Sequence, residues 1–206
     1  MKTRLNRITT KTGDQGETGL ADGSRLPKTD VRIAAMGSLD ELNCALGVLL
    51  AEPCFGDKIL NQVQDDTCQV QDDTYQAQDD RHTVRNILHT IQQHLFDIGS
   101  AIALPGHQVI NDETLTWLEE HVATYNAHLP PLTEFILPGG NRATALCHQA
   151  RSVCRRTERD MLSMQAAHPI DVINCQYLNR LSDVLFIFAR ILQKHSNSTD
   201  ILWKNP

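Results

Sequence analysis

The feature that most constrains the fold of this chain is the spacing of its apolar residues. After residue 30 they recur at intervals of three and four, which is the period of an amphipathic helix, and they almost never alternate as in a β-strand. The pattern predicts four long helices and a shorter one, over about residues 31–51, 83–103, 142–167 and 172–194, with the short helix starting at the capping stretch NDET (residues 111–114) and ending before Pro130. Long helices joined by short turns predict an all-α fold, an up-and-down five-helix bundle behind an extended N-terminal arm of residues 1–30.

The length and composition of the chain favour one soluble domain. At 206 residues there is room for one well-buried core, so we expect a single domain over residues 1–206. The first residues lack the apolar core of a signal peptide, and no later window approaches the ~18 uninterrupted apolar residues of a membrane span. Six cysteines show neither a CxxC pair nor a histidine at zinc-finger spacing, and no basic, aromatic-rich patch suggests nucleic acid. We therefore expect a cytoplasmic protein with reduced thiols, with neither membrane nor nucleic acid as a partner.

One segment, residues 62–82, carries most of the net charge of −6. It reads QVQDDTC, QVQDDTY and QAQDDRH, three copies of a seven-residue unit with six Asp and one Arg in all. A heptad repeat is typical of a coiled coil, but only one apolar position recurs in each copy, and paired Asp residues are poor helix formers. A calcium site is disfavoured because the segment lacks the alternating ligands and turn glycine of a calcium loop. We interpret it as an acidic insert that forms a solvated, flexible loop.

The stretch from Thr9 to Arg25, TTKTGDQGETGLADGSR, is rich in threonine and glycine. Glycines let a backbone approach a ligand closely, and threonine hydroxyls together with a lysine suit an oxyanion. The stretch does not match a Walker-type phosphate loop, because Lys11 and Thr12 come before the glycine and not after it. Taken alone, it is compatible with a phosphate-binding segment and also with an ordinary loop, which is the commoner meaning of such a composition.

The fourth predicted helix carries a row of cations on one side. The row has helical spacing and consists of His148, Arg151, Arg155 and Arg159, with Glu158 near the same face and Arg156 on a flank. Like charges four residues apart repel each other unless an anion neutralises them, and guanidinium forks suit phosphate or carboxylate. The alternative is a solvated face in which Glu158 pairs with its neighbours.

Polar residues on two other predicted helices extend the candidate set. Asp40 and Asn43 form a polar line on the first helix, and Asn179 and Asp183 are stacked one turn apart on the last. They offer a carboxylate to position an arginine and an amide to read a base or ribose. Since no Ser-His-Asp, Cys-His or HExxH-type arrangement is evident, we expect the protein to supply neither its own nucleophile nor a set of metal ligands.

Three long blocks of the sequence carry a resemblance to a known family. They are TTKTGDQGETGLADGSRLPKTDVRIAAMGSLDELNCALG, EFILPGGNRATALCHQARSVCRRTER and YLNRLSDVLFIFAR. In this order they resemble the signature blocks of the PduO-type ATP:cob(I)alamin adenosyltransferases, also called corrinoid adenosyltransferases. The resemblance implies a ferritin-like five-helix bundle that assembles as a homotrimer and binds ATP in clefts between subunits. It also implies transfer of the 5′-deoxyadenosyl group of ATP to Co(I) of cob(I)alamin or cob(I)yrinic acid a,c-diamide, with release of triphosphate, in adenosylcobalamin synthesis.

By motif position, the resemblance assigns ATP contacts to both the arm and the helices. The residues concerned are Thr10, Lys11, Thr12, Gly13, Thr18, Gly19 and Lys28 in the arm, and Arg155, Arg156, Glu158, Arg159 and Asn179 in the bundle. Arg155 matches an arginine that contacts the phosphates and is critical for turnover, and Arg151 with Asp40 matches a salt bridge formed between subunits. Phe135 matches an aromatic residue that closes the corrinoid pocket and helps displace the lower axial ligand of cobalt.

The resemblance also implies further ligands and partners. Mg²⁺ is expected on the triphosphate, held mostly by phosphate oxygens and water, so that few protein ligands are needed. A reductase and a B12-dependent enzyme are candidate delivery partners. Two other functions fit the same bundle: a non-catalytic protein that senses nucleotide or delivers corrinoid, and a scaffold whose arginines are only structural. The intact arm, arginine and asparagine sets favour the enzyme, since a scaffold leaves Lys11 and Lys28 unexplained.

Overall fold

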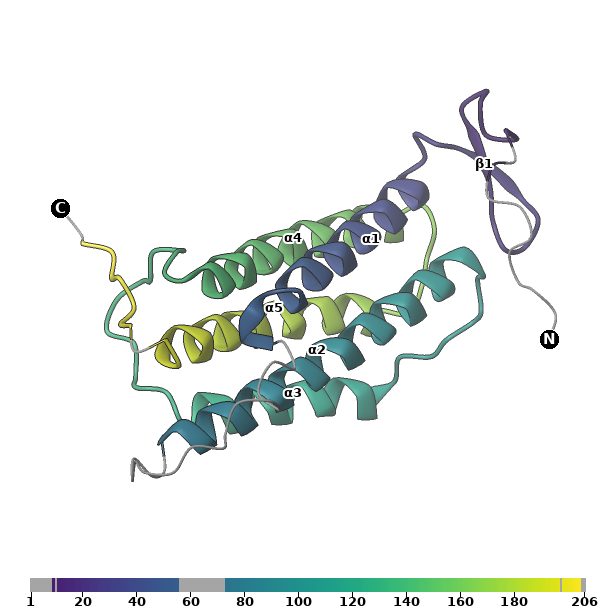
Figure 1. Ribbon diagram of the computed structural model, residues 1–206. Coiled ribbons are helices and arrows are strands. Elements are labelled where there is room, and N and C mark those ends of the chain that lie inside the picture. Colours follow the sequence, from purple (N-terminus) through teal and green to yellow (C-terminus); the bar gives the residue numbers. More distant parts are fainter. Residues whose placement is uncertain (1–8, 10, 56–72, 197, 205–206) are drawn as a thin grey trace, which may run out of the picture.

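Five helices run lengthwise through one bundle, with a small β-hairpin at one end and the C-terminus at the other (Figure 1). The computed structural model describes residues 9, 11–55, 73–196 and 198–204, and for residues 73–82 it describes the backbone alone. Along the chain the elements are β1 (Glu17–Gly19), β2 (Arg25–Pro27), α1 (Val31–Leu50), the short 3-10 helix η1 (Pro53–Phe55), α2 (Asp73–Ala103), α3 (Asp112–Asn126), α4 (Arg142–Gln165) and α5 (Ile173–Lys194). The predicted five-helix bundle is confirmed.

The core lies between the apolar faces of the helices, where the periodicity predicts it. Leu42, Leu46 and Leu49 of α1 are fully buried, and so are Ile91 and Ile98 of α2. Helix α5 packs against α4 and α3, and α1 packs against α4 and α2. Each fully buried side chain of this size contributes about 1.5–3 kcal/mol. The helices that carry the candidate site residues are therefore held in fixed relative positions.

Helix α1 is long and apolar enough to meet the length and composition criteria for a membrane span. In this fold it is a core helix, because its leucine face packs into the bundle while Asp40 and Glu41 remain exposed. Its apolar character reflects its place in the bundle.

Side-chain caps fix the starts of α1, α3 and α4. Oxygens of Asp30, Asn111 and Asn141 accept hydrogen bonds of 2.8, 2.9 and 3.0 Å from the backbone N–H groups of Arg32, Thr114 and Thr144 respectively. The capping role predicted for the NDET stretch is thus confirmed. Helix α4 ends about two residues earlier than predicted, and α5 begins about one residue later.

The acidic insert is not a loop throughout, and the prediction of a flexible loop is wrong for its last part. Helix α2 begins at Asp73, so residues 73–82, which include the third copy of the repeat, are helical. Residues 62–72 lie outside the described residues. The reason is cooperativity: once the segment from Val84 onward is helical, each residue added in front of it gains a hydrogen bond without a new nucleation cost. The low helix propensity of aspartate, about 0.7 kcal/mol per residue at most, does not prevent this extension.

The N-terminal arm contains two strands that the sequence did not predict. β1 and β2 pair antiparallel with Thr18 opposite Leu26, and Leu20 N donates to Ser24 O (2.8 Å) in the turn between them. Each strand has three residues, which is too short for an alternating pattern to stand out in the sequence. The arm therefore contains a folded hairpin where an extended segment was expected, and the fold is all-α apart from it.

Candidate functional site

The arginines of α4 differ in their contacts: some are already paired within the chain, and the guanidinium of Arg155 is not paired with any described residue. Arg156 forms an ion pair with Glu41 of α1, and this hydrogen bond lowers the pKa of the Glu41 carboxyl. Arg159 donates from Nη1 to the backbone oxygen of Arg155 (2.9 Å) and so stays on its own helix. The guanidinium of Arg155 is exposed, and within the described part of the chain it has no hydrogen bond or ion pair. Arg155 therefore presents an uncommitted, solvent-facing charge to an anion.

The opposite side of α4 is fixed against α1, which determines where the arginine row points. The buried hydroxyl of Thr157 donates to the backbone oxygen of Ser38 (3.0 Å), and the Ser38 hydroxyl donates to Asp160 (2.5 Å). The Glu41 partner of Arg156 was missed in the sequence, although it follows Asp40 directly, because the antiparallel packing of two helices is needed to bring it to α4.

A polar chain links α4, α5 and α3 near Arg155. Asn179 donates from Nδ2 to Glu158 Oε1 (3.0 Å), so two of the residues that the sequence assigns to ATP contact each other. Arg180 donates to Asn179 Oδ1 (2.9 Å) and to Glu119 Oε1 of α3 (2.8 Å), so the amide is held in one orientation. Sequence analysis did not assign Arg180 or Glu119 to the site. The sequence could have indicated Arg180, because it follows Asn179 in the third block, but no sequence pattern indicates Glu119.

Asp40 and Arg151, predicted to pair between subunits, form no ion pair with each other in one chain. Asp40 is exposed and lines a groove of about 310 Å³ between α1 and α2, beside Phe96, which is 69% exposed. The guanidinium carbon of Arg151 lies 5.9 Å from the ring centre of Phe186 on α5, and its buried Nε has no partner among the described residues. The two side chains face different helices, so a contact between them requires a second copy of the chain and stays a prediction.

The hairpin brings together part of the predicted arm set. A Cβ on Gly13 would lie 3.1 Å from the backbone oxygen of Glu17 and 3.2 Å from Lys28 Nζ, so the glycine allows both groups to approach closely. Lys11 has φ 59°, the left-handed region that non-glycine residues rarely adopt. Thr18 and Gly19 lie in β1, and Thr10 lies outside the described residues. The arm thus presents two cations close to a glycine, namely Lys11 and Lys28 beside Gly13.

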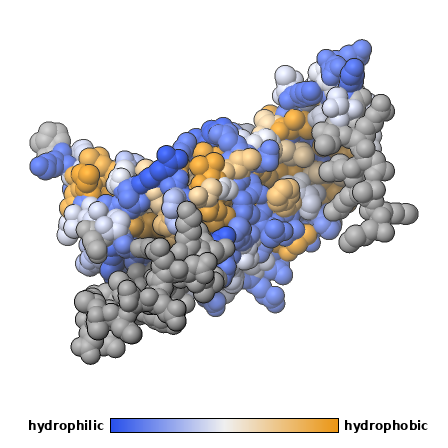
Figure 2. All heavy atoms as spheres, in the orientation of Figure 1, coloured by the Kyte–Doolittle hydropathy of each residue, from blue (hydrophilic) through white to orange (hydrophobic). Residues whose placement is uncertain are grey.

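The predicted corrinoid-facing residue, Phe135, lies at the other end of the bundle. It is 75% exposed, and the segment that carries it pairs with the C-terminal tail, since Trp203 N donates to Phe135 O (2.7 Å). The rings of Phe135 and Trp203 lie 6.4 Å apart. Figure 2 shows apolar side chains at the surface at this end of the molecule. Trp203 was missed because no local pattern connects it with a residue so far away in the sequence.

Arg190 of α5 holds both segments of this end in place. Its side chain is buried, and it donates from Nη2 to Pro130 O (2.7 Å) and from Nε to Asp200 (3.3 Å). Next to it, Gly140 has φ 97° and sits against the side chain of Gln193 with no room for a Cβ. The second glycine of the LPGG stretch is therefore required by the turn that leads from Phe135 into α4.

Helix α4 sets the distance between the parts of the candidate site. The hairpin lies beyond its C-terminal end, Phe135 lies just before its N-terminal end, and Arg155 lies between them (Figure 1). At about 1.5 Å per residue, the 24 residues of α4 span about 36 Å, and Arg155 is about 15 Å from the end at Gln165. One chain therefore does not bring the arm, Arg155 and Phe135 to a single point.

The two buried thiols of α4 are protonated, and no metal-binding cluster lies among the described residues. Burial raises the pKa of the Cys147 and Cys154 thiols far above neutral pH, so both are protonated. No group of three or more His, Cys, Asp or Glu side chains that could hold a metal ion occurs in the part of the chain described.

Comparison with known proteins points to one group. The family model for cobalamin adenosyltransferase matches residues 8–192. A cobalamin adenosyltransferase of Cupriavidus metallidurans is 42% identical over 207 residues, covering 99% of this chain and 97% of that protein. A corrinoid adenosyltransferase of Mycobacterium leprae is 38% identical over 219 residues, covering 99% and 98%. Among solved structures, a variant PduO-type ATP:corrinoid adenosyltransferase from Lactobacillus reuteri, complexed with cobalamin and ATP, matches with a TM-score of 0.80 and 29% identity, covering 97% of this chain and 100% of that one.

Proposed function

Because the chain belongs to the cobalamin adenosyltransferase family and is an ATP:corrinoid adenosyltransferase, we propose a division of labour among its residues. In this proposal the 5′-deoxyadenosyl group of ATP passes to Co(I) of a reduced corrinoid, cob(I)alamin or cob(I)yrinic acid a,c-diamide. A Co–C5′ bond forms, the C5′–O bond breaks, and triphosphate leaves with the electron pair of that bond. The observation that carries the proposal is the exposed guanidinium of Arg155 in the cation row of α4, which has no partner among the described residues.

Arg155 is the residue that meets the leaving group. Negative charge develops on the triphosphate oxygen as the C5′–O bond breaks, and a cation placed there lowers the barrier. Since Co(I) is itself the nucleophile, the protein needs no activated side chain. The protonated state of Cys147 and Cys154 is compatible with this.

The remaining ATP contacts come from two places. Asn179 and Glu158 read the nucleoside, and Arg180 keeps the Asn179 amide oriented. The arm supplies Lys11 and Lys28 to the phosphates, with Thr12, Thr18, Gly19 and Gly13 allowing a close approach. Thr10 belongs to the same proposed segment. Positioning of ATP against cobalt is then the main contribution of the protein.

Assembly of more than one copy supports the site. Since the arm and Phe135 lie at opposite ends of α4, about 36 Å apart, a neighbouring subunit is needed to complete a site that uses both. In the part of the chain that is described, Asp40 has no ion pair and the Nε of Arg151 has no partner, so the two offer complementary charges across such an interface. We propose a homotrimer in which Asp40 of one subunit pairs with Arg151 of the next.

Phe135 and Mg²⁺ have supporting roles. The exposed ring of Phe135 closes the corrinoid pocket and helps displace the lower axial ligand of cobalt. Glu158 is already bonded to Asn179, and no acidic cluster lies in the described residues, so the side chains fit an Mg²⁺ held by triphosphate oxygens and water. When bound, the ion offsets phosphate charge. We place the enzyme in the cytoplasm, where a reductase supplies Co(I) and a B12-dependent enzyme receives the product.

The test combines ATP, Mg²⁺ and chemically reduced cobalamin with the full-length protein. We expect the absorption spectrum to change to that of an alkylated corrinoid, with triphosphate released in equal amount. Binding of both substrates without this change would favour a delivery protein, and no binding would favour a scaffold. Light scattering of the same sample measures the oligomeric state, and a monomer that turns over would contradict the shared site.

A further inference from the structure

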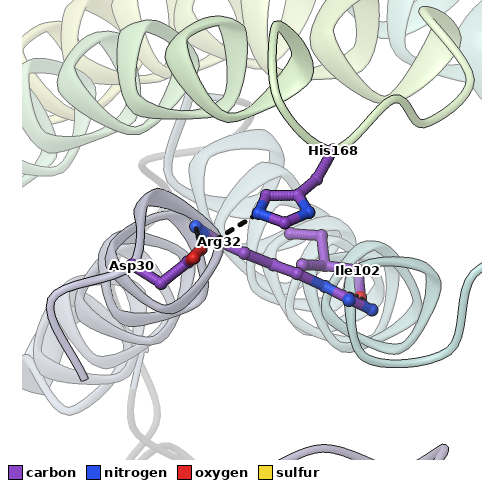
Figure 3. Close-up of polar contacts among 4 residues, drawn as sticks. All are labelled: Asp30, Arg32, Ile102 and His168. Atoms are coloured by element: carbon purple, nitrogen blue, oxygen red, sulfur yellow. Dashed lines mark hydrogen bonds and ion pairs between the residues drawn. The ribbon is translucent and has the colours of Figure 1, made fainter. Parts of the chain in front are cut away.

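Polar contacts at the start of α1 join three parts of the bundle (Figure 3). The Asp30 carboxylate accepts hydrogen bonds from His168 Nε2 (3.1 Å) and from Arg32 N (2.8 Å). The Arg32 side chain reaches the end of α2, where Nε (2.8 Å) and Nη2 both donate to the backbone oxygen of Ile102. We call Asp30, Arg32 and His168 the root cluster, because they lie where the arm joins the bundle.

The burial of Arg32 shows that this contact is a built feature of the fold. Arg32 is only 7% exposed. The carbonyl of Ile102 is among the last four of α2, which have no partner within the helix, and the end of a helix carries partial negative charge. Arg32 therefore satisfies the end of α2, while that end compensates the buried cation.

The pair of Asp30 and His168 ties the arm to α4. Asp30 is the last residue of the arm, and His168 lies just after α4, with its backbone N–H donating to Met164 O (2.8 Å). The arm is thereby fixed to the same helix that carries Arg155. The two proposed halves of the ATP site are mechanically connected at this point within one chain.

The rest of the arm has its hydrogen bonds within itself. Among the described residues, the hydrogen bonds of residues 13–27 join them only to other arm residues, such as Arg25 with Thr12 O (2.8 Å) and Lys28 N with Gly16 O (2.8 Å). Hydrogen bonds with Ser24 lower the pKa of Asp22 in the hairpin turn, and the charge of Arg32 adds to the effect. The direction of the hairpin is therefore determined at its root.

We propose that Asp30, Arg32 and His168 are positioning residues that aim the arm for ATP binding. The inference rests on the proposed function, in which Lys11 and Lys28 contact the triphosphate. A fixed arm loses little conformational freedom when ATP binds, whereas an arm released at its root must be ordered at the expense of affinity. The corrinoid-facing end, about 36 Å away along α4, is not affected.

Two variants test the cluster from different sides. Arg32→Gln removes the fork and its charge, and His168→Ala removes the tie to α4. We expect each to raise the KM for ATP about tenfold while kcat and the KM for cob(I)alamin stay within about twofold. His168→Gln keeps an N–H donor and should restore most of the affinity for ATP.

A second readout does not depend on turnover. Trypsin cleaves after Arg25 and Lys28, which are exposed in the arm. Bound ATP should protect these bonds in the unchanged protein, and Arg32→Gln and His168→Ala should need about tenfold more ATP for the same protection. Thermal unfolding of each variant checks that the bundle is intact.

Arg142→Gln is the matched control, because it removes an ion pair with Glu52 at the opposite end of the bundle. It should change neither the KM for ATP nor the protection. Unchanged ATP affinity and protection in both cluster variants would overturn the inference, and so would a joint rise of both KM values, which a general loss of structure would cause. If the wild-type protein forms no Co–C bond, the proposed function is overturned instead. The tryptic protection would still test whether the root cluster positions the arm.

Discussion

The two ends of the bundle expose different side chains, although a buried arginine holds the attached segments at each end. At the arm end the attachment is polar: a carboxylate–histidine pair and a buried arginine on a helix end fix a hairpin that exposes lysines and glycines. At the tail end the buried Arg190 ties both segments to α5, residues 135–137 and 201–203 pair with each other through their backbones, and the exposed apolar side chains are aromatic and aliphatic. In the proposed function the first surface meets the triphosphate of ATP, and the second meets the corrinoid.

At both ends, the side chains that hold the fold are different from those that are exposed to solvent. Arg32 and Arg190 are buried and tie segments together, whereas Lys28 and Phe135 are exposed. Exposed residues can therefore be replaced with little loss of stability. Each end can be disabled without the other, and the residue between them, Arg155, should affect both.

The largest effect is expected from Arg155→Ala. Removing the cation from the leaving triphosphate should lower kcat by about 10²–10³-fold. Because Arg155 is exposed and contacts no other described side chain through a hydrogen bond or ion pair, the melting temperature should stay nearly the same. Arg142→Ala on the same helix, whose side chain is 78% exposed, is the control. Normal turnover of Arg155→Ala would contradict the role of Arg155 at the leaving triphosphate.

Phe135→Ala should affect the tail end alone. Without the ring we expect about a tenfold loss in kcat/KM for the corrinoid, since both the apolar contact and the displacement of the lower axial ligand are weakened. The KM for ATP should not change. Leu162→Ala, an exposed apolar residue elsewhere on α4, should leave both constants alone. Steady-state kinetics with each substrate varied in turn would reveal an effect on ATP, which would contradict the separation.

Lys28→Ala should affect the arm end alone, and less strongly. One charge-assisted contact to phosphate is lost, so we expect the KM for ATP to rise about fivefold, the equivalent of about 1 kcal/mol. The corrinoid KM should be unchanged. Lys204→Ala at the far end of the chain is the matched control. A larger effect on corrinoid than on ATP would reverse the assignment of the two ends.

The smallest effect concerns the middle of the bundle rather than its ends. Burial lowers the pKa of His94, which contacts the Tyr177 hydroxyl (3.0 Å), and also the pKa of His121 and His148. A histidine whose folded pKa is below its ordinary value of about 6.5 binds protons better when unfolded. Stability is therefore complete above about pH 6.5 and is lost as the pH falls toward the folded pKa.

Urea unfolding at two pH values measures this pH dependence of stability. The free energy of unfolding should be lower at about pH 5.5 than at about pH 7.5, and His94→Gln should reduce the difference. An equal pH dependence in His94→Gln and in the unchanged protein would assign the acid sensitivity to other groups, such as those at the two ends.

Much of the fold was accessible from local sequence patterns. The stripe of Leu42, Leu46 and Leu49 has the helical period, so the sequence alone indicates which side of α1 is buried. The start of α2 was not accessible, because helix extension into an acidic repeat depends on the packed part of the helix downstream. The hairpin was missed since its strands have only three residues each.

For the site, the sequence by itself determined the residue types: a cation row on one helix, an asparagine on another, and a lysine- and glycine-containing arm. Only the tertiary structure decided which of these side chains are paired and which are exposed. Arg156 is committed to Glu41 and Arg155 is not, because antiparallel packing places a carboxylate opposite one and not the other. In the same way it brought His168 to Asp30 and Trp203 to Phe135. Periodicity is a local property that a sequence displays, whereas a contact between distant residues exists only once the helices have packed.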